Sequence, residues 1–475
     1  MMINILGKKF LIHNGHERFS NLEIKKRLDH YASLIPKDCK TIGLAIDNSV
    51  DWLIFDLIAH QNNLILIPIP AFFSQEQLRH LFSAVKIDLL VTNDMRLPEH
   101  FGFTLKAELA TNLLLSTIQH DHIINESGYQ KITFTSGTTG SPKGVCLSSQ
   151  YQFEVAEDLA EILQDIGIKK HLSILPFSIL LENVAGTYTS ILLEGENYIL
   201  PLVEVGFNGV NFNPSILVKA IQEYKIESII LLPQMLAGLV NFLHETKITL
   251  ESLKFIAVGG AKTPIPLLEE AKNIGLPVYE GYGLSECGSV VSVNTPHQEY
   301  IGSVGKILNN RQIRIIDHEV EVYLNEGLQY INQDFQDPGW YPTGDIGFIK
   351  DGFLFINGRK KNVLITSYGR NISPEWPESI LLNNKKIKQA MVTCFDEPFL
   401  TALIYAEEKN YQAIEAELEE VNNTLPEYAR IESLYFMDSP FTLDNGMMTA
   451  NGRIKRDHVI DTFKKKILEE RTEVV

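Results

Sequence analysis

A loop dense in glycine, serine and threonine follows a β-rich run near residue 135. The segment reads ITFTSGTTGSPKGV from Ile132 to Val145 and contains Lys143, which adds a mobile positive charge. Backbone N–H groups and hydroxyls of such a loop donate to phosphate oxygens, and glycine lets the backbone approach a ligand closely. The segment therefore indicates a phosphate-binding loop. Composition alone also fits a surface loop without a ligand, whereas the glycine and lysine spacing does not fit the GxxxxGK[ST] nucleotide loop.

The same loop carries a family resemblance. TSGTTGSPKG closely resembles the phosphate loop of the acyl-adenylate-forming superfamily, which includes acyl-CoA synthetases, luciferases and peptide-synthetase adenylation domains. Further motifs resemble those of the family in the same order, namely VGGAKTP (258–264), YEGYGLSE (279–286), YPTGDIG (341–347) and INGRKKNVLI (356–365). Because these motifs span most of the chain, it is identified as a member, which implies ATP and Mg²⁺ as cofactors.

The resemblance assigns a nucleotide site. It implies that Tyr282 lies against the adenine, that Ser285 contacts the α-phosphate where the family usually has threonine, and that Glu286 holds magnesium. These types suit the roles, because an aromatic ring offers a stacking surface, a hydroxyl donates to phosphate, and a carboxylate is a hard oxygen ligand. The residues expected to bind the nucleotide are Thr135, Ser136, Gly137, Thr138, Thr139, Gly140, Lys143, Gly260, Ala261, Tyr282, Gly283, Asp345 and Arg359.

Three further residues lie at or before the expected domain junction. By the resemblance Asp345 accepts both ribose hydroxyls and Arg359 reaches the nucleotide, although TGDIG alone is also good turn chemistry. Lys361 matches the hinge at which the small domain pivots between adenylation and thioester formation, and such hinges concentrate φ/ψ changes in few residues.

The chain departs from the family near its C-terminus. TANGRIKRD resembles the loop that carries the catalytic lysine of adenylation, but Arg453 takes the place of that lysine, and the basic Lys455 falls on a variable position. A cation between the carboxylate and the α-phosphate stabilises the transition state. Arginine keeps the charge but replaces a compact ammonium with a planar fork. Both Arg453 and Lys455 are therefore candidate catalytic residues, together with Ser285 and Glu286.

Two segments bear on the substrate. ILPFSILLENVAG (174–186) resembles the LPxxHxxE segment of long-chain fatty acyl-CoA synthetases, and YGRNISPEWPE (368–378) also resembles that branch. Ile179 occupies the usual histidine position, and Asn183 stands where the branch often has arginine. The resemblance favours a fatty acid, while the apolar residues here also fit an ordinary core.

The elements that must position these residues are those of an α/β protein. From Thr41 to Val91 apolar runs such as IGLAI and DLLVT alternate with amphipathic stretches such as DWLIFDLIAH, which predicts mostly parallel sheets. After about Trp340, short alternating segments with Gly and Asp turns predict hairpins. We expect a large N-terminal AMP-binding domain over 1–357 and a small, mobile α+β domain over 358–475.

Bulk properties exclude several classes of protein. The chain has 475 residues, which is more than a single hydrophobic core usually supports, so we expect at least two domains. The formal net charge of −17 disfavours nucleic acid as a partner. The start of the chain lacks a signal peptide, and its apolar runs are shorter than the ~20 residues of a transmembrane helix, so we expect a cytoplasmic protein. The four cysteines show neither a disulfide framework nor zinc spacing.

The sequence thus predicts an acid–thiol ligase that converts a carboxylic acid and Mg·ATP into acyl-AMP and then forms a thioester. CoA is the favoured acceptor, and an acyl carrier protein is the alternative. A different class of protein, an acyl- or nucleotide-binding pseudoenzyme impaired by Arg453, stays open. Luciferase-like oxidation has no separate support in the sequence.

Overall fold

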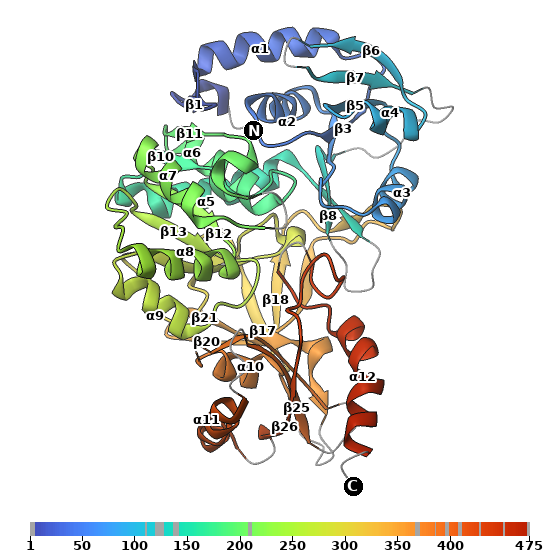
Figure 1. Cartoon of the computed structure of the whole chain (residues 1–475). Coiled ribbons are helices and arrows are strands. Elements are labelled where there is room, and N and C mark those ends of the chain that lie inside the picture. The colour runs from blue at the N-terminus through green and yellow to red at the C-terminus, as the bar shows by residue number, and fades with distance from the viewer. Residues whose placement is uncertain are drawn as a thin grey trace.

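The computed structural model of the chain describes residues 5–109, 112–118, 128–135, 142–207, 211–365, 371–384, 386–394, 399–406, 411–426, 429–449 and 452–472. In Figure 1 α1 and β1 lie at one end of the molecule and the C-terminal helices α11 and α12 at the other, with β12, β13, β17 and β18 between them. Across the described residues, no helix has the length and apolar character needed to cross a membrane.

An eight-stranded sheet carries the strand that leads into the predicted phosphate loop. Apolar strands β4, β3 and β5 pair in parallel at its centre, and β8 joins β4 in parallel. The strand order is β19 (Gln329–Tyr330), β9 (Lys143–Leu147), β8 (Lys131–Thr135), β4 (Ile65–Pro68), β3 (Thr41–Ala45), β5 (Leu89–Thr92), β7 (Leu114–Thr117) and β6 (Thr104–Glu108).

The larger sheet has 13 strands and two different halves. From β1 to β14 the neighbours pair in parallel, and from β14 to β17 they pair antiparallel. Its order is β17 (Ile313–Ile316), β18 (Glu319–Leu324), β20 (Gly339–Lys350), β21 (Phe353–Arg359), β16 (Lys306–Ile307), β15 (Ser292–Val293), β14 (Val278–Tyr282), β13 (Phe255–Val258), β12 (Ser228–Leu231), β10 (Lys170–Leu172), β11 (Glu196–Tyr198), β1 (Leu11–His13) and β2 (Arg18–Ser20).

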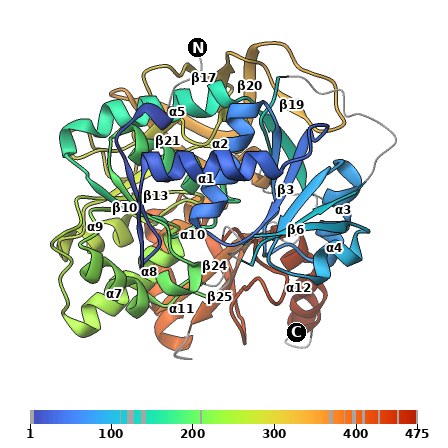
Figure 2. The ribbon, with the colours of Figure 1, turned by 90° about the horizontal axis from the view of Figure 1, so that it is seen from above.

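Helices cover these sheets, and their ends follow local sequence signals. Ser20 and Ser74 form capping boxes, and proline occupies the first turn of α7, α8 and α9. Figure 2 shows α1 beside α2, and α2 contacts β3 and β4 of the eight-stranded sheet. The helices of this part are α1 (Asn21–Leu34), α2 (Val50–Asn62), α3 (Gln75–Ala84), α4 (Arg96–His100), α5 (Ser149–Leu163), α6 (Thr189–Leu192), α7 (Pro214–Tyr224), α8 (Pro233–Thr246) and α9 (Ile265–Asn273).

The short helices include one of π type. This helix, η3 (Leu181–Tyr188), precedes α6 and lies within the segment that resembles LPxxHxxE. Helical turns of this kind occur often at functional sites. The 3₁₀ helices are η1 (Ile5–Gly7), η2 (Gln164–Ile166), η4 (Leu202–Val205), η5 (Ser285–Cys287) and η6 (Lys360–Asn362).

A buried charged network fixes β8 against η3 and α2. Lys131 in β8 is 1% exposed, and its Nζ lies 2.9 Å from Asp56 Oδ1 of α2. The same Nζ donates to Asn183 Oδ1 at 2.5 Å, and Tyr188 donates to Asp56. Breaking such a pair typically costs about 3–5 kcal/mol, because it leaves an uncompensated buried charge. The network therefore holds the start of the phosphate-loop strand in one position.

The C-terminal part is a small α+β unit. Its strands β24 (Ile387–Thr393), β25 (Leu400–Ala406) and β26 (Ile431–Phe436) form a three-stranded sheet, and β22 (Leu364–Ile365) pairs with β23 (Asn371–Ile372). Its helices are α10 (Glu375–Leu381), α11 (Tyr411–Thr424) and α12 (Arg456–Thr472). Arg456 donates to both oxygens of the buried Glu378, which ties the start of α12 to α10.

The architecture confirms the predicted α/β class with a large N-terminal part and a small C-terminal part. The hairpins expected after Trp340 are present as β20 and β21, but they belong to the 13-stranded sheet, because β21 pairs with β16. The predicted junction between residues 357 and 358 falls inside β21, which ends at Arg359. The boundary itself stays a prediction.

Candidate active site

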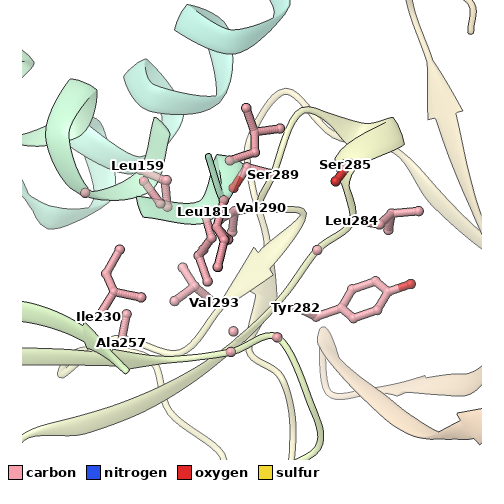
Figure 3. Close-up of a pocket in the computed structure, with 18 of the residues that line it drawn as sticks. Leu159, Leu181, Ile230, Ala257, Tyr282, Leu284, Ser285, Ser289, Val290 and Val293 are labelled. Atoms are coloured by element: carbon pink, nitrogen blue, oxygen red, sulfur yellow. The ribbon is translucent and has the colours of Figure 1, made fainter. Parts of the chain in front are cut away.

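A single cavity of about 420 Å³ gathers most of the predicted site residues that the structure describes. It opens where β13 and β14 end, and it is bordered by β8, β9 and the loop before α12. Figure 3 shows Tyr282, Leu284 and Ser285 on one stretch of chain, with the apolar Leu159 and Leu181 at a distance from them. Both groups line the same cavity, so its polar and apolar parts are continuous.

Glu286 lies on η5 at the polar end of the cavity. Tyr330 of β19 donates its hydroxyl hydrogen to Glu286 Oε1 at 2.9 Å, and the Tyr330 and Tyr341 hydroxyls are 3.2 Å apart. Burial raises the pKa of Tyr341 to about 12. Burial and the neighbouring Glu286 carboxylate also raise the pKa of Tyr330. Both hydroxyls therefore stay neutral and can donate hydrogen bonds. Lys143 Nζ lies 5.6 Å from the centre of the Tyr330 ring. Tyr330 thus contacts both Glu286 and the lysine of the phosphate loop.

The Glu286 carboxylate fits the predicted magnesium site. One of its oxygens is held by Tyr330, and within the described part of the chain the other has no hydrogen-bond partner. Magnesium usually takes one or two protein carboxylates and completes its shell with phosphate oxygens and water. Glu286 could supply that protein ligand, facing a cavity that Lys143 also lines.

Tyr282, Asp345 and Arg359 form one connected group. The Tyr282 hydroxyl donates to Asp345 Oδ2 at 2.6 Å, and Arg359 Nε lies 2.6 Å from Asp345 Oδ1. Asp345 and Arg359 are direct partners of the β20–β21 hairpin. Burial raises the pKa of Asp345, and Arg359 opposes that rise. Asp345 is 3% exposed, so a ribose hydroxyl would have to share its oxygens with these donors or displace one of them.

Arg453 reaches the cavity from the C-terminal part. Its Nε donates to the Gly260 carbonyl oxygen at 2.8 Å, so the loop before α12 docks on the loop after β13. The side chain remains exposed to solvent within the cleft. Gly452 has φ +72°, and a Cβ there would lie 2.2 Å from Gln234 Nε2. The positive φ favours glycine at this docking point, and a larger residue would also displace the Gln234 side chain.

Lys455 has a different environment. Its side chain is exposed like that of Arg453, but it is absent from the cavity lining given by the described residues. Its backbone N–H donates to the Met447 carbonyl oxygen at 2.8 Å. The structure therefore brings Arg453, and not Lys455, to the cavity.

The other predicted residues divide into three groups. Thr135, Gly260, Gly283 and Ser285 line the cavity. Ala261 and Lys361 lie outside its lining, and Lys361 borders a neighbouring hollow with Arg359. Ser136, Gly137, Thr138, Thr139 and Gly140 lie outside the described residues.

The apolar part of the cavity lies between a sheet and helices. Ile230 and Ala257 come from β12 and β13, and Leu159 and Leu181 face them from α5 and η3 (Figure 3). Ala257 is half-buried in a strand that is otherwise buried, because its methyl group faces the cavity. Ile179, at the usual histidine position, also lines the cavity.

Glu182 organises the segment around this chamber. It is fully buried, and its Oε2 accepts from the backbone N–H groups of Ile174 and Leu175 at 3.1 and 2.9 Å. Its Oε1 lies 2.9 Å from His171 Nε2. A Cβ at Gly186 would lie 2.3 Å from Glu182 Oε1, so glycine leaves the space for this pair.

Sequence reasoning missed Tyr330, His171 and Ser228 as neighbours of the site. Tyr330 is 44 residues from Glu286, and His171 is 57 residues from Ser228. No motif contains either pair. Tyr330 reaches Glu286 because β19 pairs with β9, which contacts η5, and His171 and Ser228 are paired directly in β10 and β12.

A pH-dependent stability is expected from Glu280, which precedes Tyr282 in β14. Its carboxyl is 5% exposed, accepts from Thr263 N at 2.9 Å, and has its pKa raised by burial from 4.5 to about 7. Between these values the folded chain keeps a proton that the unfolded chain has released, so stability falls as pH rises. As the pH rises from 4 to 8, we expect the free energy of unfolding of wild type to fall by on the order of 2–3 kcal/mol relative to that of Glu280→Gln.

Thermal unfolding of both proteins at the two pH values measures this difference. The buried Glu378 has a pKa that burial raises to about 7, but it titrates in both proteins and cancels from the comparison. A difference in Tm that does not change with pH would contradict the raised pKa of Glu280.

Asp345→Ala is expected to raise the KM for ATP by about tenfold to 100-fold with a smaller change in kcat. The reason is that a ribose contact made equally in ground and transition states contributes uniform binding. Asp345→Asn keeps an acceptor for the Tyr282 hydroxyl and serves as the milder control. Steady-state kinetics with varied ATP measure both variants, and a loss confined to kcat would contradict the ribose assignment.

Comparison with known proteins places the chain in a family. The AMP-binding enzyme family matches residues 7–329, and the AMP-binding enzyme C-terminal domain matches residues 361–472. A curated relative, the probable acyl-activating enzyme 16 of Arabidopsis thaliana, is 24% identical over 77% of this chain and 66% of its own length. The long-chain-fatty-acid–CoA ligase FadD15 of Mycobacterium bovis is 30% identical over 44% of this chain and 40% of its own length.

Among solved structures, the o-succinylbenzoate CoA synthetase MenE of Bacillus subtilis, in complex with its acyl-adenylate intermediate, superposes with a TM-score of 0.76. It is 21% identical over 96% of this chain and 97% of that chain, which supports the fold. The alignments with the two curated relatives span less than two thirds of those proteins. Because the first family match covers more than half of the chain, the protein belongs to the AMP-binding enzyme family.

Proposed function

We propose that this enzyme activates a carboxylic acid with ATP and transfers the acyl group to a thiol. In the first step a carboxylate oxygen of the acid attacks the α-phosphorus of ATP, the bond to pyrophosphate breaks, and acyl-AMP forms. In the second step a thiol loses its proton and attacks the acyl carbonyl, and AMP leaves. Neither step needs a nucleophilic side chain, so positioning and charge stabilisation carry the catalysis.

The observation that carries this proposal is the convergence of Arg453 and Glu286 on one cavity that continues into an apolar chamber. Arg453 would stabilise charge on the α-phosphate and the attacking carboxylate. Glu286 would hold magnesium, which neutralises phosphate charge when bound. Lys143 would reach the outer phosphates. The chamber beside them offers a place for the acyl group.

We propose a fatty acid as the acid. Support comes from the aliphatic lining of the chamber and from the similarity to FadD15, named as a long-chain-fatty-acid–CoA ligase. The similarity to MenE, named for o-succinylbenzoate, leaves aromatic acids as the competing class. We propose CoA as the acceptor, with a carrier-protein thiol as the alternative.

The direct experiment incubates the protein with Mg·ATP, CoA and one acid at a time, and identifies the products by mass spectrometry. The acids run from acetate through fatty acids of increasing length to benzoate derivatives. We expect acyl-AMP and acyl-CoA from an aliphatic acid. Products from aromatic acids alone would contradict the fatty-acid assignment, and acyl-AMP without acyl-CoA would favour a carrier protein.

Lys361→Pro is expected to slow the second step more than the first. Lys361 lies in η6, directly after the last strand of the large sheet, where proline would fix φ at the proposed pivot. Lys361→Ala removes the charge but keeps the backbone free, and it is the matched control. Pyrophosphate release and thioester formation from supplied acyl-AMP are measured separately, and equal losses in both would argue against a pivot here.

A further inference from the structure

The apolar chamber runs along two strands away from the reacting groups. Its lining includes Ser228 at the start of β12 and Leu232 just after that strand, and also Phe255 and Gly259 on β13 and its end. Four residues of strand advance about 13 Å. Ser228 therefore lies at the far end of the chamber from Gly260, where Arg453 docks.

This far end is polar, although the middle is not. His171, Ser190 and Ser228 line it and are only 4%, 5% and 6% exposed. His171 Nδ1 lies 3.0 Å from Ser228 Oγ, while His171 Nε2 lies 2.9 Å from Glu182 Oε1. We call His171, Ser190 and Ser228 the polar floor.

The floor keeps hydrogen-bonding capacity for a ligand. The Ser228 hydroxyl has one donor and two acceptor sites, and its bond to His171 uses only one of them. Ser190 lines the cavity, and its hydroxyl has no hydrogen-bond partner in the described portion of the chain. Buried polar groups rarely go unpaired, and an apolar ligand end would leave this hydroxyl without water or a partner.

Hydrogen bonds from outside the chamber fix the positions of His171 and Ser228. Glu182 is fixed by two backbone N–H groups, it orients His171, and His171 orients Ser228. Gly186 keeps the space for this chain of contacts, since a Cβ there would lie 2.6 Å from His171 Nε2. The floor is therefore a positioned set of groups, and it also limits how far an acyl chain can extend.

We propose that the acid carries a hydrogen-bonding oxygen, a hydroxyl or a keto group, at the end remote from its carboxylate, and that Ser228 and Ser190 bind it. This inference rests on the proposed function, because it takes the chamber as the acyl site. The substrate class thus narrows from fatty acids in general to aliphatic acids with an oxygenated far end.

The test compares pairs of straight-chain acids of equal length, from six to sixteen carbons, that differ only by a terminal hydroxyl. The readout is kcat/KM for pyrophosphate release. At the length that reaches the floor, we expect the hydroxy acid to be preferred by about tenfold, the size of one or two hydrogen bonds. Ser228→Ala and Ser190→Ala should each reduce that preference by roughly threefold or more.

Ser173→Ala is the matched control. Ser173 follows β10, is fully buried, and lies 3.4 Å from Thr187 Oγ1, away from the chamber lining that the described residues provide. It should leave the preference unchanged. Thermal unfolding with each acid gives a second readout that does not need turnover, and the hydroxy acid should raise the Tm of wild type more than that of Ser228→Ala.

The outcomes separate the two proposals. If plain acids are turned over and the hydroxyl gives no preference at any length, the polar-floor inference fails and the acid-activating function stands. If neither turnover nor a Tm shift occurs with any acid, both fail. An equal preference in wild type, Ser228→Ala and Ser190→Ala would also overturn the inference, because the discrimination would then come from elsewhere.

Discussion

Glu286→Gln is expected to abolish measurable turnover, a loss of at least about 10³-fold. The substitution removes the charge of the proposed magnesium ligand without changing side-chain volume. The amide can still accept from Tyr330, which now holds Glu286 Oε1 at 2.9 Å, so the fold should be unaffected. The measurement is the rate of pyrophosphate release over a range of magnesium concentrations.

Measurements of ATP binding distinguish a magnesium-binding role of Glu286 from a structural role. Wild type should bind ATP more tightly when magnesium is added, and Glu286→Gln should lose most of that gain. Glu299→Gln, which alters a surface carboxylate paired with Lys272, is the control and should behave as wild type. Near wild-type release at limiting magnesium would contradict the assignment of Glu286.

Arg453→Ala should slow adenylation by roughly 10²–10³-fold and leave thioester formation from supplied acyl-AMP nearly unchanged. The sequence could not decide between Arg453 and Lys455, since side chains two apart on an extended loop can diverge or converge. In the structure, Arg453 lines the cavity and contacts Gly260, whereas Lys455 is absent from the lining that the described residues form. This geometry supports Arg453 as the group that acts during adenylation.

Two further variants complete that comparison. Lys455→Ala should be mild, because its side chain lies outside the cavity lining. Arg453→Lys should keep or raise the rate if a point-like ammonium serves as well as the guanidinium. A severe loss in Lys455→Ala together with a mild loss in Arg453→Ala would mean that the loop shifts during the reaction.

Much of the fold could be predicted because its signals are local. The apolar run DLLVT contains strand β5, and the amphipathic stretch DWLIFDLIAH lies within helix α2. The hairpin after Trp340 was also predicted, but its membership of the large sheet was not. That membership depends on pairing between β16 and β21, which are 45 or more residues apart in the chain and carry no shared pattern.

The site shows the same division. Family motifs predicted Tyr282, Glu286, Asp345 and Arg359, which the structure brings to one region. Contacts such as Tyr330 with Glu286, or Lys131 with Asp56, arise from strands and helices that meet only in the folded chain. These contacts depend on which strands pair and which side chains are buried together. The periodicity of a single sequence does not contain that information.

Acid-dependent exchange of labelled pyrophosphate into ATP tests the central claim most directly, because it reports reversible formation of acyl-AMP without a thiol acceptor. We predict exchange that requires both magnesium and an aliphatic acid, that is lost in Glu286→Gln, and that falls by roughly 10²–10³-fold in Arg453→Ala. Absence of exchange in the wild-type protein with every acid tested, while ATP still binds, would contradict acyl-AMP formation and favour a nucleotide-binding pseudoenzyme.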